Sequence, residues 1–369
     1  PAHLAEYGGL NGIPVFLLAG TILATATPAF AKGGEPKPTD ELERPILLGV
    51  SGSSLEHAFV EDGTGSFDVF CYVGTLGSLV KDGADIFILS NNHVLAKENV
   101  PDRDPTDLGI SGDSSLELLA SPDGLEVIQP GLLDVKGPCG FLGDPANAVA
   151  YVNLNSWVPL SFEPSFDYDT DPPGKAPLNL VDAAIAQTDS SDVDAGGYIL
   201  GIGTHSGTPV SLGLTEPVQK MGRTSKHTFG TIAAVDVTLI VAYDGGAARF
   251  EDQIDIVGNC DEPFSASGDS GSLILTVPDQ SDRAPVGLLY AGGPDEEGVD
   301  HTFANPIGDV LDALSDVNSG NFSMVECGVD GEGAMGCNHS NATDSIPRCK
   351  GGGGGGGGGG NKPDNPGPP

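Results

Sequence analysis

Short apolar runs, each ended by turn-forming residues, recur along most of this chain. Between residues 44 and 315 they are separated by glycine, proline, aspartate and asparagine, and long apolar stripes with a 3.6-residue period are scarce. The 369 residues include 55 glycines and 29 prolines, which favour turns and disfavour long helices. The pattern therefore predicts a mostly β domain.

The apolar runs also indicate where strands and a helix should lie. We expect strands over residues 67–79, 85–89, 149–154, 231–242, 271–277 and 284–291. Residues 306–315 carry apolar side chains at helical spacing and begin with Pro306, which suits the first turn of a helix. The sequence thus predicts antiparallel β structure that closes in a single terminal helix.

The charge is strongly one-sided, with 16 basic and 52 acidic residues and a net charge of −36. A nucleic-acid-binding protein normally carries a basic patch, and the sequence has no Lys/Arg cluster. We therefore expect no nucleic-acid partner. An acidic, solvated surface is typical of a secreted or salt-adapted protein.

The ends of the chain differ from its body. Residues 13–28 are apolar and lead to Ala29-Phe30-Ala31, as in a secretory segment with a small-x-small cleavage site, so 1–31 predict export to a periplasmic or extracellular location. An ordinary buried segment is the alternative, and the stretch is too short to predict a stable membrane span. Residues 32–43 are expected to form a linker, 316–350 a small Cys-bearing segment, and 351–369 a disordered Gly/Pro-rich tail.

Six cysteines suit an oxidising compartment: Cys71, Cys139, Cys260, Cys327, Cys337 and Cys349. Their pairing is left open, because six cysteines allow fifteen connectivities. None of the spacings forms a Cys-x-x-Cys motif, so we expect no zinc site.

Three polar residues interrupt the apolar pattern at nearly equal spacing. His93 follows the expected strand 85–89, which holds its imidazole at a strand end. Asp182 precedes the apolar run 183–186, where an unpaired buried charge would be costly. Ser270 lies in the glycine-rich run 265–272. The order His, Asp, Ser is that of chymotrypsin-type enzymes and differs from the orders in subtilisin and the α/β-hydrolases.

These residue types together favour nucleophilic catalysis. A serine hydroxyl is a weak nucleophile until a base takes its proton, and the base needs an acid that fixes its tautomer. The glycines beside Ser270 let the backbone bend so that amide N–H groups point at one spot. There they can bind the oxyanion of a tetrahedral intermediate.

On these motifs the chain resembles the trypsin-like, chymotrypsin-fold serine peptidases, especially bacterial members of the streptogrisin and α-lytic type. The matching segments are the histidine strand (87–94), the aspartate strand (181–185), the nucleophile loop (267–271), the Gly-Arg-Thr hairpin (221–225 and 229–232), the substrate-binding strand (286–292) and the C-terminal helix (306–315). The resemblance implies an all-β peptidase domain over 44–315. It would contain two six-stranded antiparallel β-barrels, a short C-terminal helix, and an active site between the barrels.

By this resemblance the protein is a secreted serine endopeptidase that works through an acyl-enzyme. His93 would be the general base, Asp182 would orient it, and Ser270 would attack the carbonyl. The backbone N–H groups of Gly268 and Ser270 would form the oxyanion hole.

The resemblance also suggests which residues contact the substrate. Phe264 stands six residues before Ser270, where trypsins carry an acid that selects Lys/Arg substrates. We therefore expect a preference for apolar or small side chains. Tyr290, Ala291 and Gly292 would bind the substrate as part of the strand that lines the site.

Several positions depart from the family pattern. Val94 stands where the family often has a cysteine, and the hairpin disulfide of the bacterial members is absent, with Gln219 and Phe229 near its positions. Residues 97–178 are expected to hold an inserted acidic loop. No Ile-Val-Gly-Gly terminus exists, and cleavage after Arg44 is disfavoured because Pro45 follows. Activation by a newly formed N-terminus is therefore not expected.

Two other motifs are set aside, and two other functions stay open. Residues 167–171 alternate acids as a calcium loop does, but Pro172 and Leu178 stand where the loop needs Gly and Glu. Residues 201–203 lack the spacing of a phosphate-binding loop. We expect no cofactor or metal and a protein or peptide substrate, and the oligomeric state is left open. A non-catalytic binding or surface protein on the same fold, and an esterase, are the alternatives.

Overall fold

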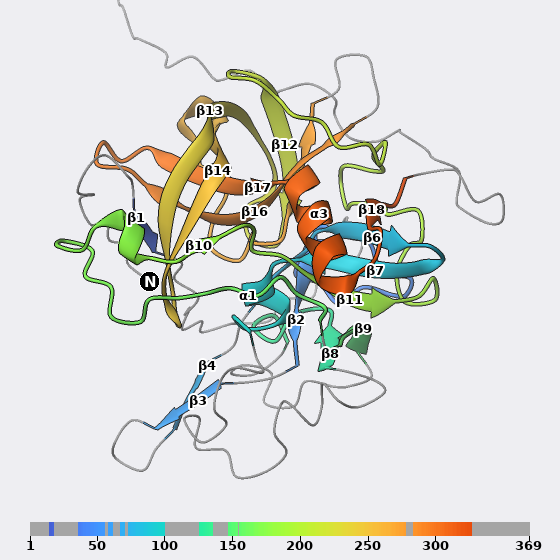
Figure 1. The fold of residues 1–369 in the computed structure, drawn as a ribbon. Helices are drawn as coiled ribbons and strands as arrows, with labels where there is room; N and C mark the ends of the chain where they lie inside the picture. Colours follow the sequence, from blue (N-terminus) through green and yellow to red (C-terminus); the bar gives the residue numbers. More distant parts are fainter. Residues whose placement is uncertain are drawn as a thin grey trace, which may run out of the picture.

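Two curled antiparallel sheets form the body of the molecule (Figure 1). The computed structural model describes residues 15–17, 36–55, 58–61, 67–70, 73–99, 125–135, 147–153, 155–277 and 283–326. Within this part of the chain the predicted fold class is confirmed: the structure is mostly β, and its one longer helix follows the last strand of the second sheet.

The first sheet closes into a six-stranded barrel because one stretch of chain serves both of its edges. Its strands are β2 (Val50–Ser54), β5 (Gly74–Leu76), β6 (Ser78–Asp82), β7 (Asp85–Ser90), β8 (Leu125–Ile128), β9 (Ala148–Val152) and β11 (Ala184–Thr188). They are ordered β6-β7-β11-β9-β8-β2-β5. Only Gly77 separates β5 from β6, so residues 74–82 count as one strand of the six. This strand pairs with β2 at one end and with β7 at the other.

The second sheet closes directly. Its strands are β12 (Pro217–Gly222), β13 (Lys226–Tyr243), β14 (Gly246–Gly258), β15 (Leu273–Thr276), β16 (Pro285–Pro294) and β17 (Asp300–Pro306). They follow the order β13-β12-β15-β16-β17-β14, and β13 also pairs with β14. These pairings complete the predicted pair of six-stranded barrels.

Shorter elements lie outside the two barrels. β1 (Val15–Leu17) and β10 (Leu178–Asn179) add in parallel to β13 and β14, β3 (Ala58–Glu61) pairs with β4 (Phe67–Phe70), and β18 (Ser323–Met324) pairs with β6. The one-turn helices are α1 (Asn92–Leu95), η5 (Pro173–Lys175) and η6 (Asn259–Asp261). The Cys260 side chain is disulfide-bonded.

The predicted terminal helix is confirmed as α3 (Ile307–Asn318), which packs against β16 and β17. Its apolar positions Ile307, Val310, Leu311 and Leu314 are all buried, as their spacing predicts. Ser319 ends the helix in the left-handed conformation. The predicted strand 67–79 is divided among β4, β5 and the start of β6, and Gly77 separates β5 from β6.

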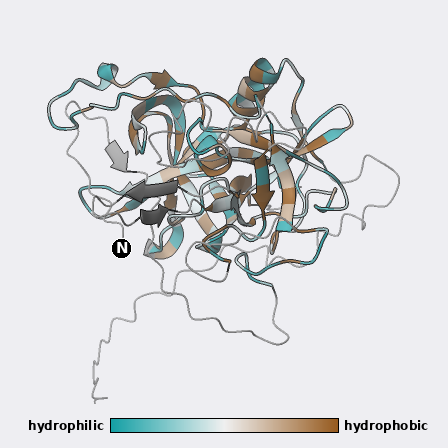
Figure 2. Ribbon diagram, turned by 90° about the horizontal axis from the view of Figure 1, so that it is seen from below, coloured by the Kyte–Doolittle hydropathy of each residue, from teal (hydrophilic) through white to brown (hydrophobic). Residues whose placement is uncertain are grey.

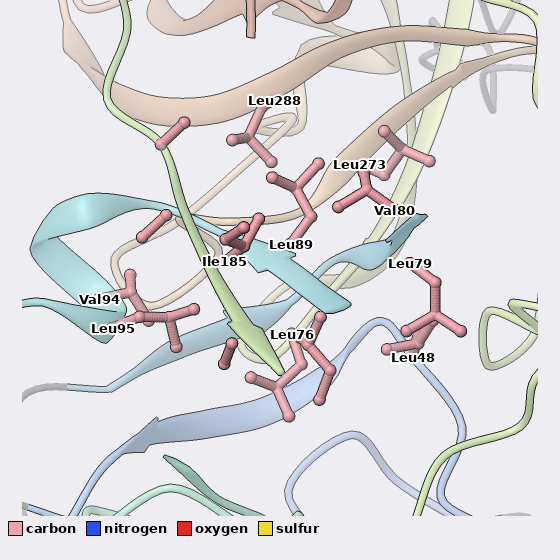
Figure 3. Packing of buried hydrophobic residues seen from close by; sticks show 14 of the residues in the cluster. Leu48, Leu76, Leu79, Val80, Leu89, Val94, Leu95, Ile185, Leu273 and Leu288 are labelled. Carbon is pink, nitrogen blue, oxygen red and sulfur yellow. The ribbon is translucent and has the colours of Figure 1, made fainter. Parts of the chain in front are cut away.

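Apolar side chains of both barrels meet in one continuous core cluster. Leu273 and Leu288 of the second barrel lie near Val80 and Leu89 of the first (Figure 3). Hydrophobic positions lie mainly on the strands and on α3, whereas the connecting loops are mostly hydrophilic (Figure 2). The shared core fixes the two barrels against each other. The loops between them are therefore held in one arrangement.

Candidate active site

His93 and Asp182 come from two neighbouring strand ends. β7 and β11 pair in antiparallel fashion, with Ser90 opposite Ala184. The end of β7 and the beginning of β11 therefore lie at the same edge of the first barrel. His93 follows β7 within α1, and Asp182 lies two residues before β11, so the fold brings these two predicted residues together.

The two side chains form a short hydrogen bond. His93 Nδ1 lies 2.6 Å from Asp182 Oδ2, and the His93 backbone N–H donates to Asp182 Oδ1 at 3.3 Å. The carboxylate is fully buried, whereas the His93 side chain keeps 11% of its surface exposed. A carboxylate that binds Nδ1–H leaves Nε2 as the proton acceptor. The pair can thus act as a base with an orienting acid.

Buried asparagines hold the backbone around this pair. Asn91 Nδ2 donates to the Asp182 carbonyl oxygen at 2.7 Å, and the Asp182 backbone N–H donates to Asn305 Oδ1 at 2.9 Å. Asn92 Nδ2 donates to Asn99 Oδ1 at 2.8 Å, and the Asn99 backbone N–H donates to Asn92 Oδ1 at 3.1 Å. Sequence reasoning did not single out these asparagines. The polar run 90–92 after an apolar strand is a signal for Asn91 and Asn92 only.

The loop that carries Ser270 packs closely on the first barrel. The Ser270 carbonyl accepts the Thr75 backbone N–H at 2.8 Å, and the Gly271 N–H donates to the Leu289 carbonyl at 2.8 Å. Gly271 has φ +92°, and a Cβ there would lie 2.3 Å from the Thr75 carbonyl oxygen and 2.1 Å from Ser90 Oγ. Only glycine fits this approach. Ser270 is thereby held where the two barrels meet.

The Ser270 side chain is partly buried, and its hydroxyl makes no hydrogen bond to any residue that the structure describes. The structure thus contains the His–Asp hydrogen bond and holds the serine loop against the same barrel, without a serine–histidine hydrogen bond. Catalytic hydrogen bonds in enzymes without substrate are often long and tighten when substrate binds.

Two amide groups of the loop are available to a ligand. Among the described residues, neither the Gly268 nor the Ser270 backbone N–H has a hydrogen-bond acceptor. Gly268 adopts φ +94°, a conformation that favours glycine. These are the two groups predicted for the oxyanion hole.

Asp269, between them, is anchored by a buried cation. Its carboxylate lies 3.2 Å from Lys220 Nζ, and neither side chain has exposed surface. The carboxylate also accepts the backbone N–H groups of Ala266, Thr224 and Ser225. Burial lowers the pKa of Lys220, and the Asp269 charge acts in the opposite direction. The Asp269 charge beside Ser270 is therefore balanced from within the second barrel.

Arg223, in the hairpin predicted from the family resemblance, joins the two barrels. Its Nε and Nη2 atoms donate to the two carboxylate oxygens of Asp134, each at 2.7 Å. Asp134 also accepts the Ser51 hydroxyl. This planar, two-bond geometry is the strongest form of an arginine–carboxylate contact. Arg223 therefore fixes the hairpin that supports Asp269.

The predicted substrate contacts need correction at two positions. Phe264 and Tyr290 have no exposed surface, because their rings pack into separate apolar clusters of the second barrel. They form core and do not line an open surface. Ala291 is nearly buried, and Gly292 is partly exposed.

No metal or membrane element is found in the described ranges. They contain no group of three His, Cys, Asp or Glu side chains that could hold a metal ion. None of their helices is both long and apolar enough to cross a bilayer.

A comparison with protein families matches residues 132–304 to the Nal1 C-terminal domain. The matched span includes Asp182 and Ser270 and begins after His93. A stretch of 85 residues is 36% identical to Protein NARROW LEAF 1 of Oryza sativa subsp. japonica. This stretch covers 23% of the chain and 14% of the length of the plant protein.

Solved structures with a similar fold include bacterial serine proteases. A glutamic-acid-specific serine protease with a histidine triad in substrate binding is 14% identical, with a TM-score of 0.41, over 76% of this chain and 100% of its own. Thermobifida fusca Protease A is 15% identical, with a TM-score of 0.36, over 74% and 98%. Cellulomonas bogoriensis chymotrypsin is 14% identical, with a TM-score of 0.35, over 76% and 98%.

Proposed function

We propose that this protein is an exported serine endopeptidase. The observation that carries the proposal is the buried 2.6 Å hydrogen bond between His93 and Asp182, beside a glycine-rich serine loop at the junction of two β-barrels. A histidine held by a buried carboxylate, with its other ring nitrogen free, is the arrangement that nucleophilic serine catalysis requires. Export is proposed from the apolar segment 13–31 alone.

The proposed reaction has two halves. Ser270 Oγ attacks the peptide carbonyl carbon, and its proton passes to His93 Nε2. The C–N bond then breaks, and His93 returns the proton to the leaving amine, which leaves an acyl ester on Ser270. Water attacks this ester and gives a proton to His93, which passes it to Ser270 Oγ as the C–O bond breaks, so that the carboxylic acid product leaves and the serine is restored. Asp182 stabilises the imidazolium in both halves.

The backbone of the serine loop supplies the electrostatic part of the mechanism. The negative oxygen of each tetrahedral intermediate would accept the N–H groups of Gly268 and Ser270, which have no other acceptor among the described residues. One such donor contributes about 2.7–4 kcal/mol to transition-state stabilisation.

A fluorophosphonate probe tests the proposal directly, because it reacts only with an activated serine. We expect the folded protein to be labelled at Ser270, and Ser270→Ala to lose both labelling and casein hydrolysis. Ser267→Ala, a serine replacement at an exposed residue of the same loop, is the matched control and should keep both.

The other outcomes separate the alternatives. Folded protein that is not labelled would support a binding protein on the same fold, and full casein hydrolysis by Ser270→Ala would refute the assignment. Labelling together with turnover of esters, but not of amides, would indicate an esterase.

A further inference from the structure

The β13–β14 hairpin extends past the second barrel and ends beside the His93–Asp182 pair. Its last residues, Tyr243 and Gly246, face each other across a two-residue turn. The Tyr243 hydroxyl donates to Asp182 Oδ2 at 2.8 Å, and the Tyr243 ring lies edge-on to the His93 ring with 6.1 Å between centroids. A residue of the second barrel thus reaches the acid of the first.

Tyr243 completes the set of donors around the Asp182 carboxylate. Oδ2 accepts both the Tyr243 hydroxyl and His93 Nδ1, and Oδ1 accepts the His93 backbone N–H. Among the described residues, Tyr243 is the one donor to this carboxylate that does not belong to His93. With donors on two sides, the carboxylate plane has little freedom to rotate.

The hydroxyl stays protonated, and can act as a donor, at neutral pH. Burial, together with the neighbouring Asp182 charge, holds the pKa of Tyr243 well above its usual value. Phe162 and Phe250 pack against the ring, which fixes the position of the oxygen.

The turn of the hairpin is tied to the segment that follows His93. The backbone N–H groups of Asp244 and Gly245 donate to the two Glu98 carboxylate oxygens at 3.1 and 2.8 Å. Glu98 is nearly buried and has a left-handed backbone, with φ +59°. A Cβ on Gly245 would lie 2.7 Å from the Phe162 ring, so the turn packs closely against this ring. Glu98 therefore holds Tyr243 in reach of Asp182.

We propose that Tyr243 is a positioning residue, which orients the Asp182 carboxylate toward His93 from the tip of the β13–β14 hairpin. The inference rests on the proposed peptidase function. By this inference the second barrel helps to orient the base His93, in addition to carrying the nucleophile Ser270. A merely structural tyrosine would fill the core with its ring and would need no hydroxyl.

The chain offers a matched comparison in Tyr290. It is also fully buried, its ring packs against Phe250, and its hydroxyl has no hydrogen-bond partner among the described residues. Tyr243→Phe and Tyr290→Phe thus remove the same atom from neighbouring core positions. Only the first change removes a hydrogen bond to Asp182.

The test measures kinetics, the His93 proton and stability on both variants. For Tyr243→Phe we expect kcat to fall about tenfold, as for the loss of one hydrogen bond to a charged group, with KM within about twofold. The low-field proton resonance of the His93–Asp182 hydrogen bond should shift. The melting temperature of Tyr290→Phe shows what removal of a buried hydroxyl does to folding alone. Glu98→Gln weakens the two hydrogen bonds that anchor the hairpin turn, so it should also lower kcat.

Two results would overturn the inference: an unchanged kcat with an unmoved low-field resonance in Tyr243→Phe, or a loss that appears in KM alone. Failure of the proposed function is seen separately, because the wild-type protein would then not react with the fluorophosphonate probe. The low-field resonance would still report whether Tyr243 orients Asp182.

Discussion

At the scale of single residues, the buried ion pair beside Ser270 carries the largest desolvation cost. Lys220 and Asp269 have no exposed surface, so both charges have left water. Lys220 Nζ also donates to the Ser225 hydroxyl and to the Lys226 carbonyl oxygen. A buried pair of this kind adds little net stability, but removal of one partner leaves an uncompensated charge.

Lys220→Met should therefore be strongly destabilising. The change keeps the volume of the side chain and removes its charge, which leaves Asp269 buried without its cation. We expect a loss of about 3–5 kcal/mol in the free energy of unfolding, measured by urea denaturation.

Two further variants show whether this loss comes from the charge. Lys226→Met removes an exposed ammonium from the same hairpin and should change stability by less than about 0.5 kcal/mol. The double variant of Lys220→Met and Asp269→Asn, which removes both charges, should recover part of the loss. Equal urea midpoints for the Lys220 and Lys226 variants would contradict the argument.

At the scale of elements, the loop before Ser270 packs closely against the strands β16 and β17. Ser265 Oγ lies 2.7 Å from Thr302 Oγ1, which joins the loop to β17. A Cβ on Gly292 would lie 3.5 Å from Ser265 Oγ and 2.6 Å from the His301 carbonyl oxygen. Polar atoms of the loop and of β17 therefore approach Gly292 closely.

We accordingly expect cleavage after small residues. Peptides that differ only at the residue before the scissile bond should show kcat/KM roughly tenfold higher for Ala than for Phe, because a large ring does not fit between the loop and β17. Rapid cleavage after Lys or Arg would contradict this expectation, and so would faster cleavage after Phe than after Ala.

The arrangement of the strands also limits how much of the site can be predicted from the sequence. The sequence singles out His93, Asp182 and Ser270 because each polar residue lies next to an apolar strand, which is a local pattern. Tyr243 ends the apolar run 239–243 and is typical of a core residue. Its contact with Asp182 depends on how far β13 curls, and the pairing of β13 with β14 shifts register three times between Ile232 and Leu239.

The same limit explains the other differences. The charged residues of 249–255 break the apolar pattern of β14, so the sequence does not indicate a 13-residue strand there. Lys220 occupies a strand position where a lysine normally faces solvent, and its burial depends on Asp269, 49 residues further along the chain. Counting back from Ser270 gives the position of Phe264 in the sequence, but it does not show that the ring points into the core.

At the scale of the whole molecule, the segment between β11 and β12 packs against both barrels and contains a buried histidine. His205 is 3% exposed. Its Nδ1 accepts the Gly207 backbone N–H at 3.1 Å, and its Nε2 lies 3.0 Å from the Ser78 hydroxyl of the first barrel. Since Nδ1 is occupied as an acceptor, the ring is neutral. Burial lowers the pKa of His205 to about 4.

This histidine makes the stability of the fold depend on pH. Between pH 6.5 and about 4 the unfolded chain binds a proton at His205 and the folded chain does not, so folding is weakened as pH falls through this window. Above pH 6.5 neither state is protonated, and the effect vanishes. Linkage gives a slope of about 1.4 kcal/mol per pH unit, or roughly 3 kcal/mol over the window.

His205→Asn keeps an acceptor for the Gly207 N–H and removes the titrating ring. Urea unfolding of both proteins at pH 7.5, 6 and 5 should show the variant losing less stability toward acid than the wild type. Parallel curves for the two proteins would show that His205 is protonated in the folded state as readily as in the unfolded chain.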